Sequence, residues 1–383
     1  MAQRHLDPAD PKAGPETVPV AGDALAAYLQ AQATEFLRAL RQHRETGGGT
    51  SNHSASNGSA PNGTEETIDA ARALRRSARR ISGTLHTFRP LLDADWSEAL
   101  RPELAWLSGT LALEHAYAAR LERLLAALHR LSGSSAFPAQ ATGSAVGSRA
   151  TTAESRPKRA EPESAAGPHS GSTSERGHLT VGAAKAGALL ERQLTLARTR
   201  AHSAALQALG SSRFHAVADN VAVLASEVPL TPAAATADLK PLAAAAEERL
   251  SDAVTGLPLL TAGHPYNAAA LVQGLSTDTA PQPQDAPWHQ VRLLLRLHRY
   301  AREVLHGDEA PVDVHLLSAG QAMDRHRDAA EAASAAASAA RTPRIAPATA
   351  YALGVLHADQ RHEVEAARFA FQRAWRKETA GAP

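Results

Sequence analysis

The feature that most constrains this chain is the spacing of its apolar residues, which recur every three to four positions through most of its 383 residues. No segment shows the alternation of apolar and polar residues that is typical of a β-strand. Hydrophobic residues make up 44% of the chain and aromatic residues only 4%, because most apolar positions are Ala or Leu. Ala and Leu favour helices, whereas β-branched and aromatic residues favour strands. The sequence therefore predicts an all-α fold.

The helical pattern divides into segments separated by clusters of Pro, Gly and polar residues. Helices are predicted over residues 22–45, 64–88, 93–131, 179–228, 231–250, 288–306, 314–340 and 348–377. We expect a break near Pro102, because proline removes a helical hydrogen bond. Thr231 followed by Pro232 is typical of an N-cap with proline at the first helical position.

Segments rich in Pro, Gly, Ser and Asn cannot bury a core and are predicted to be disordered. They are the N-terminal segment 1–21, the loop 46–63, the linker 132–177 and the tail 378–383. The linker divides the helical pattern into a first half, residues 22–131, and a second half, residues 178–377.

Several functional classes are excluded by composition. The chain contains no Cys, which excludes disulfides, thiolate catalysis and Cys-ligated metal sites. Its first 20 residues contain no apolar stretch typical of a secretion signal, and no apolar run is long enough to span a bilayer. The formal net charge of +1 indicates neither a nucleic acid nor a membrane as partner. We therefore expect a cytoplasmic protein with no membrane partner and no cofactor.

The placement of the arginines is more informative than their number, since codon bias also explains why 35 of the 40 Lys and Arg residues are Arg. On a helix over residues 72–88, six basic side chains fall within roughly 140° of the circumference. They are Arg72, Arg75, Arg76, Arg79, Arg80 and His86. No acidic residue stands between Asp69 and Asp93 to relieve their repulsion. Two interpretations remain open, a merely solvated face and a site for a polyanion, whose phosphate oxygens the guanidinium group fits well.

A second basic stripe repeats the spacing of the first. His289, Arg292, Arg296 and Arg299 occupy roughly 80° of a helix. His289, Arg292 and Arg296 have the same offsets as Arg72, Arg75 and Arg79 in the first half. Chance can produce such a match in an Arg-rich chain, but both stripes open long amphipathic helices, which favours an internal duplication.

Several segments together resemble the CHAD domain, the conserved-histidine α-helical domain. They are the stretch from Arg72 through RPLLDADWSEALRPELAWLSGTLALEHAYAARLERLLAAL, then WHQVRLLLRLHRYAREVL, MDRHRDAAEAA and YALGVLHADQRHEVEAARFAFQRAWRK. The resemblance extends from about Gly22 to Lys377, interrupted by the two low-complexity segments. It implies two pseudo-symmetric antiparallel helical bundles around a basic channel that binds inorganic polyphosphate.

The chain departs from the family pattern in both halves. Arg72 stands where the family has its first-half histidine, and His115-Ala116 stands where the family has an Arg-Asp pair. In the second motif His289 is retained, whereas Leu293 and Leu297 replace residues that are usually basic. Arg72 keeps a positive charge, whereas the loss of bases from the second motif should weaken phosphate binding.

The sequence supports a metal site or a site for stacked nucleobases less well than it supports a polyanion site. Asp324, His326 and Asp328 are spaced at i,i+2 on a helix, which does not bring their side chains to one metal ion. His298, on the apolar side of its helix, is more typical of a satisfied core histidine than of a ligand. The four Trp residues are more typical of core anchors than of platforms for stacked bases. We therefore expect no metal site.

These observations predict a non-enzymatic protein that binds inorganic polyphosphate and associates with polyphosphate granules. The residues expected to contact the polymer are Arg72, Arg75, Arg76, Arg79, Arg80, His289, Arg292, Arg296 and Arg299. The alternative is a degenerate CHAD-like scaffold that has lost this ligand and binds a protein partner. Generic nucleic-acid binding is the weakest of the three hypotheses.

Overall fold

A computed structural model describes residues 21–48, 61–133, 171–264, 272, 274–275, 282–307 and 312–381. Helices make up almost all of these ranges, and the extended pairing within them is one isolated antiparallel bridge between Leu92 and Leu230. The helices are α1 (Ala21–Gly48), α2 (Pro61–Thr87), α3 (Ala94–Leu131), α4 (Gly171–Leu209), α5 (Ser212–Ser226), α6 (Lys240–Thr255), α7 (Leu259–Ala262), α9 (Ala286–His306), α10 (Val314–Ala340) and α11 (Pro347–Gly381). Short 3-10 turns are η2 (Arg89–Leu91), η3 (Pro232–Ala235) and η4 (Pro283–Asp285). The all-α prediction is confirmed.

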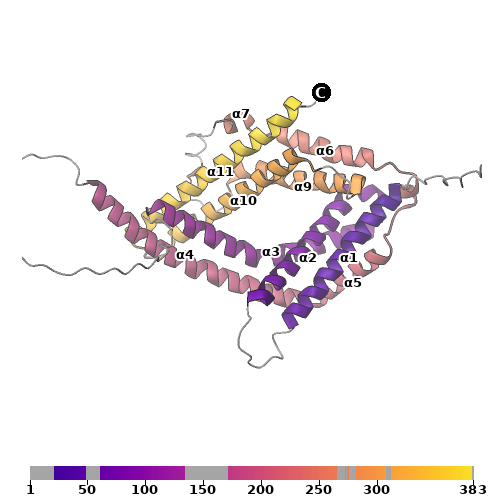
Figure 1. Cartoon of the computed structure of the whole chain (residues 1–383), viewed down its shortest axis with the longest axis horizontal. Helices are drawn as coiled ribbons and strands as arrows, with labels where there is room; N and C mark the ends of the chain where they lie inside the picture. The colour runs from indigo at the N-terminus through magenta and orange to yellow at the C-terminus, as the bar shows by residue number, and fades with distance from the viewer. Residues whose placement is uncertain are drawn as a thin grey trace, which may run out of the picture.

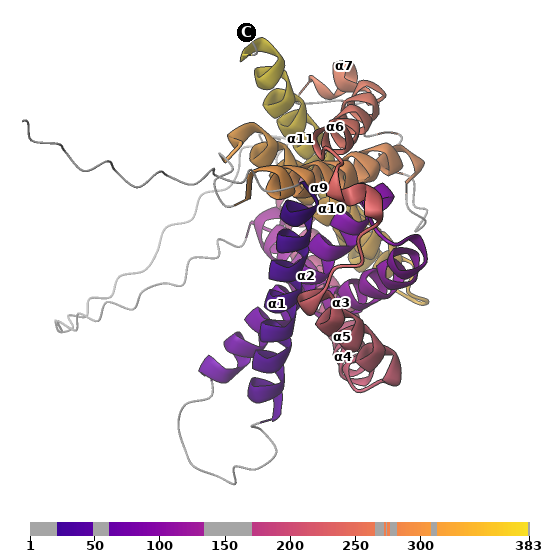
Figure 2. The ribbon, with the colours of Figure 1, turned by 90° about the vertical axis from the view of Figure 1, so that its right-hand side faces the viewer.

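The helices form two bundles that are connected by long antiparallel pairs (Figure 1). In the first bundle α1 packs on α2 and α5, and α2 packs on α3. In the second bundle α9 packs on α6 and α10, and α10 packs on α11. α4 pairs with α3 and also packs on α11, so the α3–α4 pair links the two bundles. Figure 2 shows α6 and α7 at one end of the molecule and α4 and α5 at the other.

Three apolar clusters stabilise this arrangement. The first lies between α1, α2, α5 and the start of α3, and it includes the fully buried Phe36, Phe88 and Phe214. The second consists mostly of Ala and Leu side chains from the end of α3, α4, the end of α10 and the start of α11. The third surrounds Trp288 and Phe371 in the second bundle. Each fully buried large apolar side chain contributes about 1.5–3 kcal/mol to the stability of the fold. These clusters therefore hold the helices that carry the arginine stripes in place.

The order of helix packing repeats along the chain. The contacts of α1 with α2, α2 with α3 and α3 with α4 recur as those of α6 with α9, α9 with α10 and α10 with α11. Helix α4 packs on α3 and also on α11, and α5 packs on α1, so both helices contact helices that precede residues 132–177.

The structure corrects two of the predicted helices for local reasons: a predicted break is absent from one, and the other contains a break that was not predicted. α3 continues through Pro102, since Leu100 and Leu104 are buried on either side of this exposed residue and hold the helix against the apolar core. The predicted helix 179–228 is two helices, divided after Gly210, with the Ser211 side chain accepting a hydrogen bond from the Phe214 backbone N–H at 3.2 Å. This N-cap satisfies a donor at the new helix start.

The predicted helix start at Thr231 and Pro232 is also wrong. Pro232 opens only the 3-10 turn η3, and the Thr231 side chain makes no capping bond. The Thr231 backbone N–H instead donates to the Leu91 carbonyl at 2.9 Å, which ties this segment to the end of α2. Helix α6 begins later, at Lys240, with a proline in its own first turn.

The predicted disordered segments lie mostly outside the described residues, namely residues 1–20, 49–60, 134–170 and 382–383. At their edges the described chain is helical: α1 reaches Gly48, α2 begins at Pro61, α4 begins at Gly171 and α11 reaches Gly381. Within the described ranges, none of the helices combines the length and apolarity needed to cross a bilayer.

Candidate anion-binding cavity

The two arginine-striped helices, α2 and α9, pack against each other. Gly83 makes this close approach possible, because a Cβ atom at this position would lie only 2.6 Å from Cδ2 of Tyr300 and 3.2 Å from Cδ2 of Leu297. Leu74, Ile81 and Leu85 are fully buried on the other side of α2. The basic side chains of α2 are therefore directed away from the core and toward α9.

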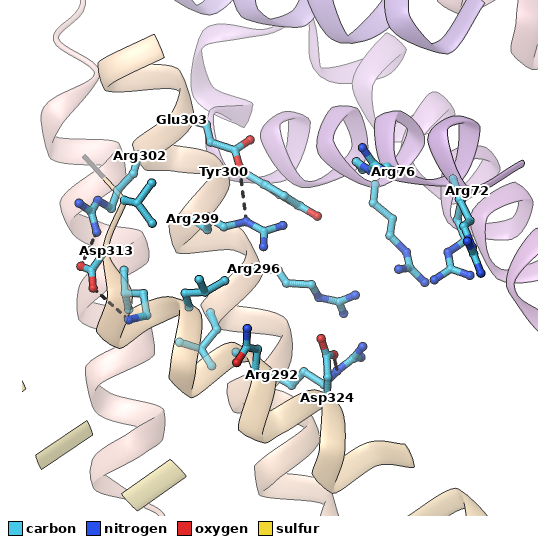
Figure 3. A pocket seen from close by; sticks show the side chains of 18 of the residues that line it. Arg72, Arg76, Arg292, Arg296, Arg299, Tyr300, Arg302, Glu303, Asp313 and Asp324 are labelled. Carbon is cyan, nitrogen blue, oxygen red and sulfur yellow. Dashed lines mark hydrogen bonds and ion pairs between the residues drawn. The ribbon is translucent and has the colours of Figure 1, made fainter. Parts of the chain in front are cut away.

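A cavity of about 570 Å³ lies between α2, α9 and α10. Seven of the nine predicted residues line it, namely Arg72, Arg75, Arg76, Arg79, Arg292, Arg296 and Arg299. Figure 3 shows Arg72 and Arg76 extending from α2 toward the space that Arg292 and Arg296 enter from α9. The cavity also contains the carboxylates of Glu303, Asp313 and Asp324 (Figure 3).

Three of the seven predicted arginines that line the cavity have carboxylate partners. Arg72 lies 3.1 Å from Asp69, and Arg299 lies 3.4 Å from Glu303. Arg292 donates from Nε to Asp324 at 2.6 Å.

The other four, Arg75, Arg76, Arg79 and Arg296, have no ion-pair partner among the described residues. The Nε atom of Arg296 is buried and has no hydrogen-bond partner in the same part of the chain. Buried polar groups in proteins are normally paired, so these guanidinium groups are suited to a ligand that supplies acceptors.

Burial and mutual repulsion oppose the charges of Arg75, Arg79 and Arg296. Burial, and after it the charge of Arg75, lowers the pKa of Arg79 from its usual value to about 10. Burial and the charges of Arg292 and Arg79 lower the pKa of Arg296 to about 10 as well. The pKa of Arg75 is lowered in the same way, by burial and by four neighbouring arginines. All three groups remain protonated near neutral pH, so the cavity concentrates positive charge at a cost to the folded protein.

Arg80 differs from the predicted role, because it makes an internal ion pair. Its Nε donates to Glu303 at 2.8 Å, and the Tyr28 hydroxyl donates to the same carboxylate at 2.7 Å. Burial opposes the charge of Arg80, but the hydrogen bond and the charge of Glu303 outweigh it and raise the pKa. Burial and Glu303 also raise the pKa of Tyr28 above its usual value. Glu303 therefore connects α1 and α2 with α9 and removes Arg80 from the set of free cations.

His289 is not among the residues that line the arginine cavity. It lines a separate cavity of about 530 Å³, together with Asp285 and Arg361, and its ring meets that of His326 edge to face at 5.5 Å. Burial lowers the pKa of His289, so the neutral form is favoured. His289 shares a helical arc with Arg292 and Arg296, but the arc does not indicate that His289 faces a different cavity. His289 lies at the start of α9, where α10 and α11 surround it.

An adjoining cavity of about 310 Å³ shares Arg75 and His115 with the first. It adds Arg120 and Arg123 from α3 and Arg327 from α10, three residues absent from the predicted set. The spacing of Arg120 and Arg123 at i,i+3 on α3 is the signal that could have indicated them. All three have internal partners, since Arg120 bonds to Glu331, Arg327 bonds to Asp328, and Arg123 donates to Gln360 at 2.6 Å.

His115 stands where the two cavities meet. Its Nε2 lies 3.2 Å from Nη2 of Arg72, which donates to it, so this nitrogen is unprotonated. Burial and the charge of Arg72 lower the pKa of His115, which keeps the ring neutral.

A buried ionic network in the second bundle was not predicted from the sequence. Asp285, only 3% exposed, accepts from Arg361 at 2.7 and 3.1 Å and from Arg368, which also donates to Glu365 at 2.7 Å. His326 stacks on Trp288 beside this network, and burial lowers its pKa well below the usual value. The partners come from segments far apart in the chain, so no local pattern indicates them. Two arginines and two carboxylates balance, which makes the network structural.

The donor set of the cavity suits anion binding. The described residues include no group of three or more His, Asp or Glu side chains that could hold a metal ion. His298 is buried, as predicted for a core histidine, although its Nδ1 has no hydrogen-bond partner among the described residues. Trp288 is buried in the core as predicted.

The chain is similar to proteins of a known family. The family model of the CHAD domain matches residues 60–337, which is more than half of the chain. The solved structure of PptA from Streptomyces chartreusis is 64% identical in sequence and has a TM-score of 0.69, and the match covers 93% of this chain and 99% of that chain. A search of curated proteins gives no significant match.

Proposed function

The chain belongs to the CHAD-domain family, and we propose that it binds inorganic polyphosphate in the cavity between α2, α9 and α10. The observation that carries this proposal is the presence of four arginines in the cavity that have no carboxylate partner among the described residues. Each can give charge-assisted hydrogen bonds to phosphate oxygens, and such bonds are about twice as strong as neutral ones.

A linear polymer fits the row of cations better than a single phosphate does. Arg72, Arg75, Arg76 and Arg79 follow one another along α2, and a helix rises about 1.5 Å per residue, so the row is about 10 Å long. A phosphate chain offers negative charge continuously over such a distance. Arg296 on α9 faces the same cavity and would contact the chain from the other side.

The proposed role is binding without catalysis. Catalysis of phosphoryl transfer or hydrolysis needs a nucleophile or a base free to accept a proton. The three carboxylates of the cavity are engaged, Glu303 with Arg80, Asp313 with Arg302 and Asp324 with Arg292. Each of these carboxylates is thus held by an arginine, and the neutral His115 of the same cavity accepts from Arg72.

A scaffold that has lost the ligand and binds a protein partner is the second candidate. The internal ion pairs of Arg72, Arg80, Arg292 and Arg299 favour it, because paired arginines contribute less to a polyanion site. Polyphosphate remains the better proposal because repulsion among the unpaired arginines is costly unless an anion relieves it. In the cell we propose association with polyphosphate granules in the cytoplasm.

Titration of the purified chain with long-chain polyphosphate, at low and moderate salt and with duplex DNA as competitor, tests the proposal. We expect tight binding that weakens as salt rises, since counterions are released on binding, and that DNA does not displace. The double substitution Arg75→Glu and Arg79→Glu should abolish binding and leave helicity intact. The control is Arg38→Glu with Arg41→Glu on the exposed face of α1, which should leave the affinity unchanged. No binding by the wild-type chain at low salt would refute the proposal and favour the scaffold.

A further inference from the structure

Corresponding positions of the two halves meet at the cavities. On α3 the lining residues include Ala112, His115, Ala116 and Ala119, and on α10 they include Asp324, Arg327, Asp328 and Glu331. The intervals between successive residues are the same on both helices. Since α3 follows α2 as α10 follows α9, these residues are equivalent in the two halves.

The two helices differ in charge at the equivalent positions. α10 carries three carboxylates, and α3 carries three alanines in their places. Each carboxylate of α10 neutralises an arginine: Asp324 accepts from Arg292 at 2.6 Å, Asp328 bonds to Arg327, and Glu331 bonds to Arg120. The α3 wall of the cavity offers no such neutralisation.

This difference explains why Arg75 is unpaired. Arg75 on α2 is equivalent to Arg292 on α9, and Ala112 is equivalent to Asp324. Arg292 has its carboxylate, whereas Arg75 lines the adjoining cavity with Ala112 and has no ion-pair partner among the described residues; after burial, the charges of Arg327, Arg292, Arg296 and Arg72 lower its pKa. The methyl group of Ala112 also leaves space in which a ligand can approach Arg75.

We propose that Ala112, which lines the adjoining cavity together with Arg75, sets the affinity of the arginine cavity for phosphate chains by leaving Arg75 without a carboxylate, and that the first-half arginines Arg75 and Arg79 form the strong side of that cavity. The second-half side is weakened by its own carboxylate Asp324, which a phosphate must displace before it reaches Arg292. This inference rests on the proposed function and names the residues that set the strength of that site.

Three single variants test the inference in titrations with polyphosphate at fixed salt. Ala112→Asp should pair with Arg75 and lower the affinity about tenfold, which corresponds to the loss of one charge-assisted contact. Asp324→Ala should free Arg292 and raise the affinity by a similar factor. Ala126→Asp adds the same charge to an exposed position of α3 that lines none of these cavities, and it should change the affinity much less. Equal affinities of Ala112→Asp and the wild type would overturn the inference.

A measurement without ligand separates this inference from the proposed function. Ala112→Asp should raise Tm in the wild-type background and should not raise it in an Arg75→Gln background, because the new carboxylate then has no partner. An equal effect in both backgrounds overturns the pairing of positions 75 and 112. If the coupling is present but the wild-type chain binds no polyphosphate, the proposed function fails and the charge asymmetry of the two halves stands.

Discussion

The positive charge of Arg79 should destabilise the unliganded protein. Arg79 lines the cavity between α2 and α9 and has no carboxylate partner among the described residues. In the substitution Arg79→Met the aliphatic part of the side chain keeps its packing, while the guanidinium group is lost. We expect the variant to be more stable than the wild type and to bind polyphosphate more weakly, which is a trade-off between stability and function.

The size of this effect follows from the pKa of Arg79, which burial and then the charges of neighbouring arginines lower from its usual value to about 10 in the folded protein. One pKa unit corresponds to about 1.4 kcal/mol, so a pKa lowered by about 2.5 sets an upper limit of about 3.5 kcal/mol. A lowered pKa of a base means that its charged form destabilises the folded state. This cost is fully present below about pH 10 and is relieved only as the pH rises above it. Partial solvent access reduces it, and we expect a gain of about 1–2 kcal/mol at neutral pH.

Urea denaturation followed by circular dichroism measures this gain, and Arg80→Met is the matched control. Arg80 is the next residue on the same helix but is paired with Glu303 at 2.8 Å, so its loss should destabilise the fold by about 1–2 kcal/mol. The two neighbouring substitutions should thus act in opposite directions. Polyphosphate should stabilise the wild type more than Arg79→Met, because a ligand stabilises the state that binds it. An Arg79→Met variant less stable than the wild type in the absence of ligand would refute the reasoning.

Two further substitutions test the packing of the site. Gly83→Ala would place a Cβ atom 2.6 Å from Cδ2 of Tyr300, so α2 and α9 must separate. We expect the free energy of unfolding, measured by urea denaturation, to fall by about 1–3 kcal/mol and polyphosphate binding to weaken. If both values were unchanged, the argument that Gly83 allows the close approach would be contradicted. Asp285→Asn leaves Arg361 and Arg368 buried with too little negative charge. It should cost about 3–5 kcal/mol, seen as a lower Tm, and a wild-type Tm would show that Asp285 is not the partner that matters.

The helices of this fold could be predicted from the sequence because their signals are local. The helix predicted over residues 314–340 is α10, and the one predicted over residues 288–306 is α9 apart from its first turn. The apolar spacing that indicates each helix also indicates which face is buried, so Leu74, Ile81 and Leu85 lie in the core opposite the arginines of α2. The facing of α2 and α9 did not follow from either helix alone, since it depends on Gly83 meeting Tyr300 from the other half.

The partners of the charged residues could not be predicted, because they come from other helices. Arg80 and Arg79 are adjacent on α2 and fall within the same arc, yet only Arg80 meets Glu303, which lies 223 positions further along the chain. His289 matches Arg72 in spacing, but the surroundings of α9 at its start place it beside His326 rather than among the arginines. Helical periodicity gives the direction of a side chain and says nothing about the element on the other side.

The binding capacity of a basic stripe therefore depends on what faces it. Nine residues were predicted to contact polyphosphate, seven line the cavity, and four of those are free of carboxylates among the described residues. In a duplicated fold the two halves offer an internal comparison: Arg292 meets Asp324, whereas the equivalent Arg75 meets Ala112. The loss of one carboxylate frees an arginine without adding a base, so a net charge as low as +1 is compatible with a strongly cationic site. The three apolar clusters stabilise the fold and offset the destabilising repulsion of the free arginines.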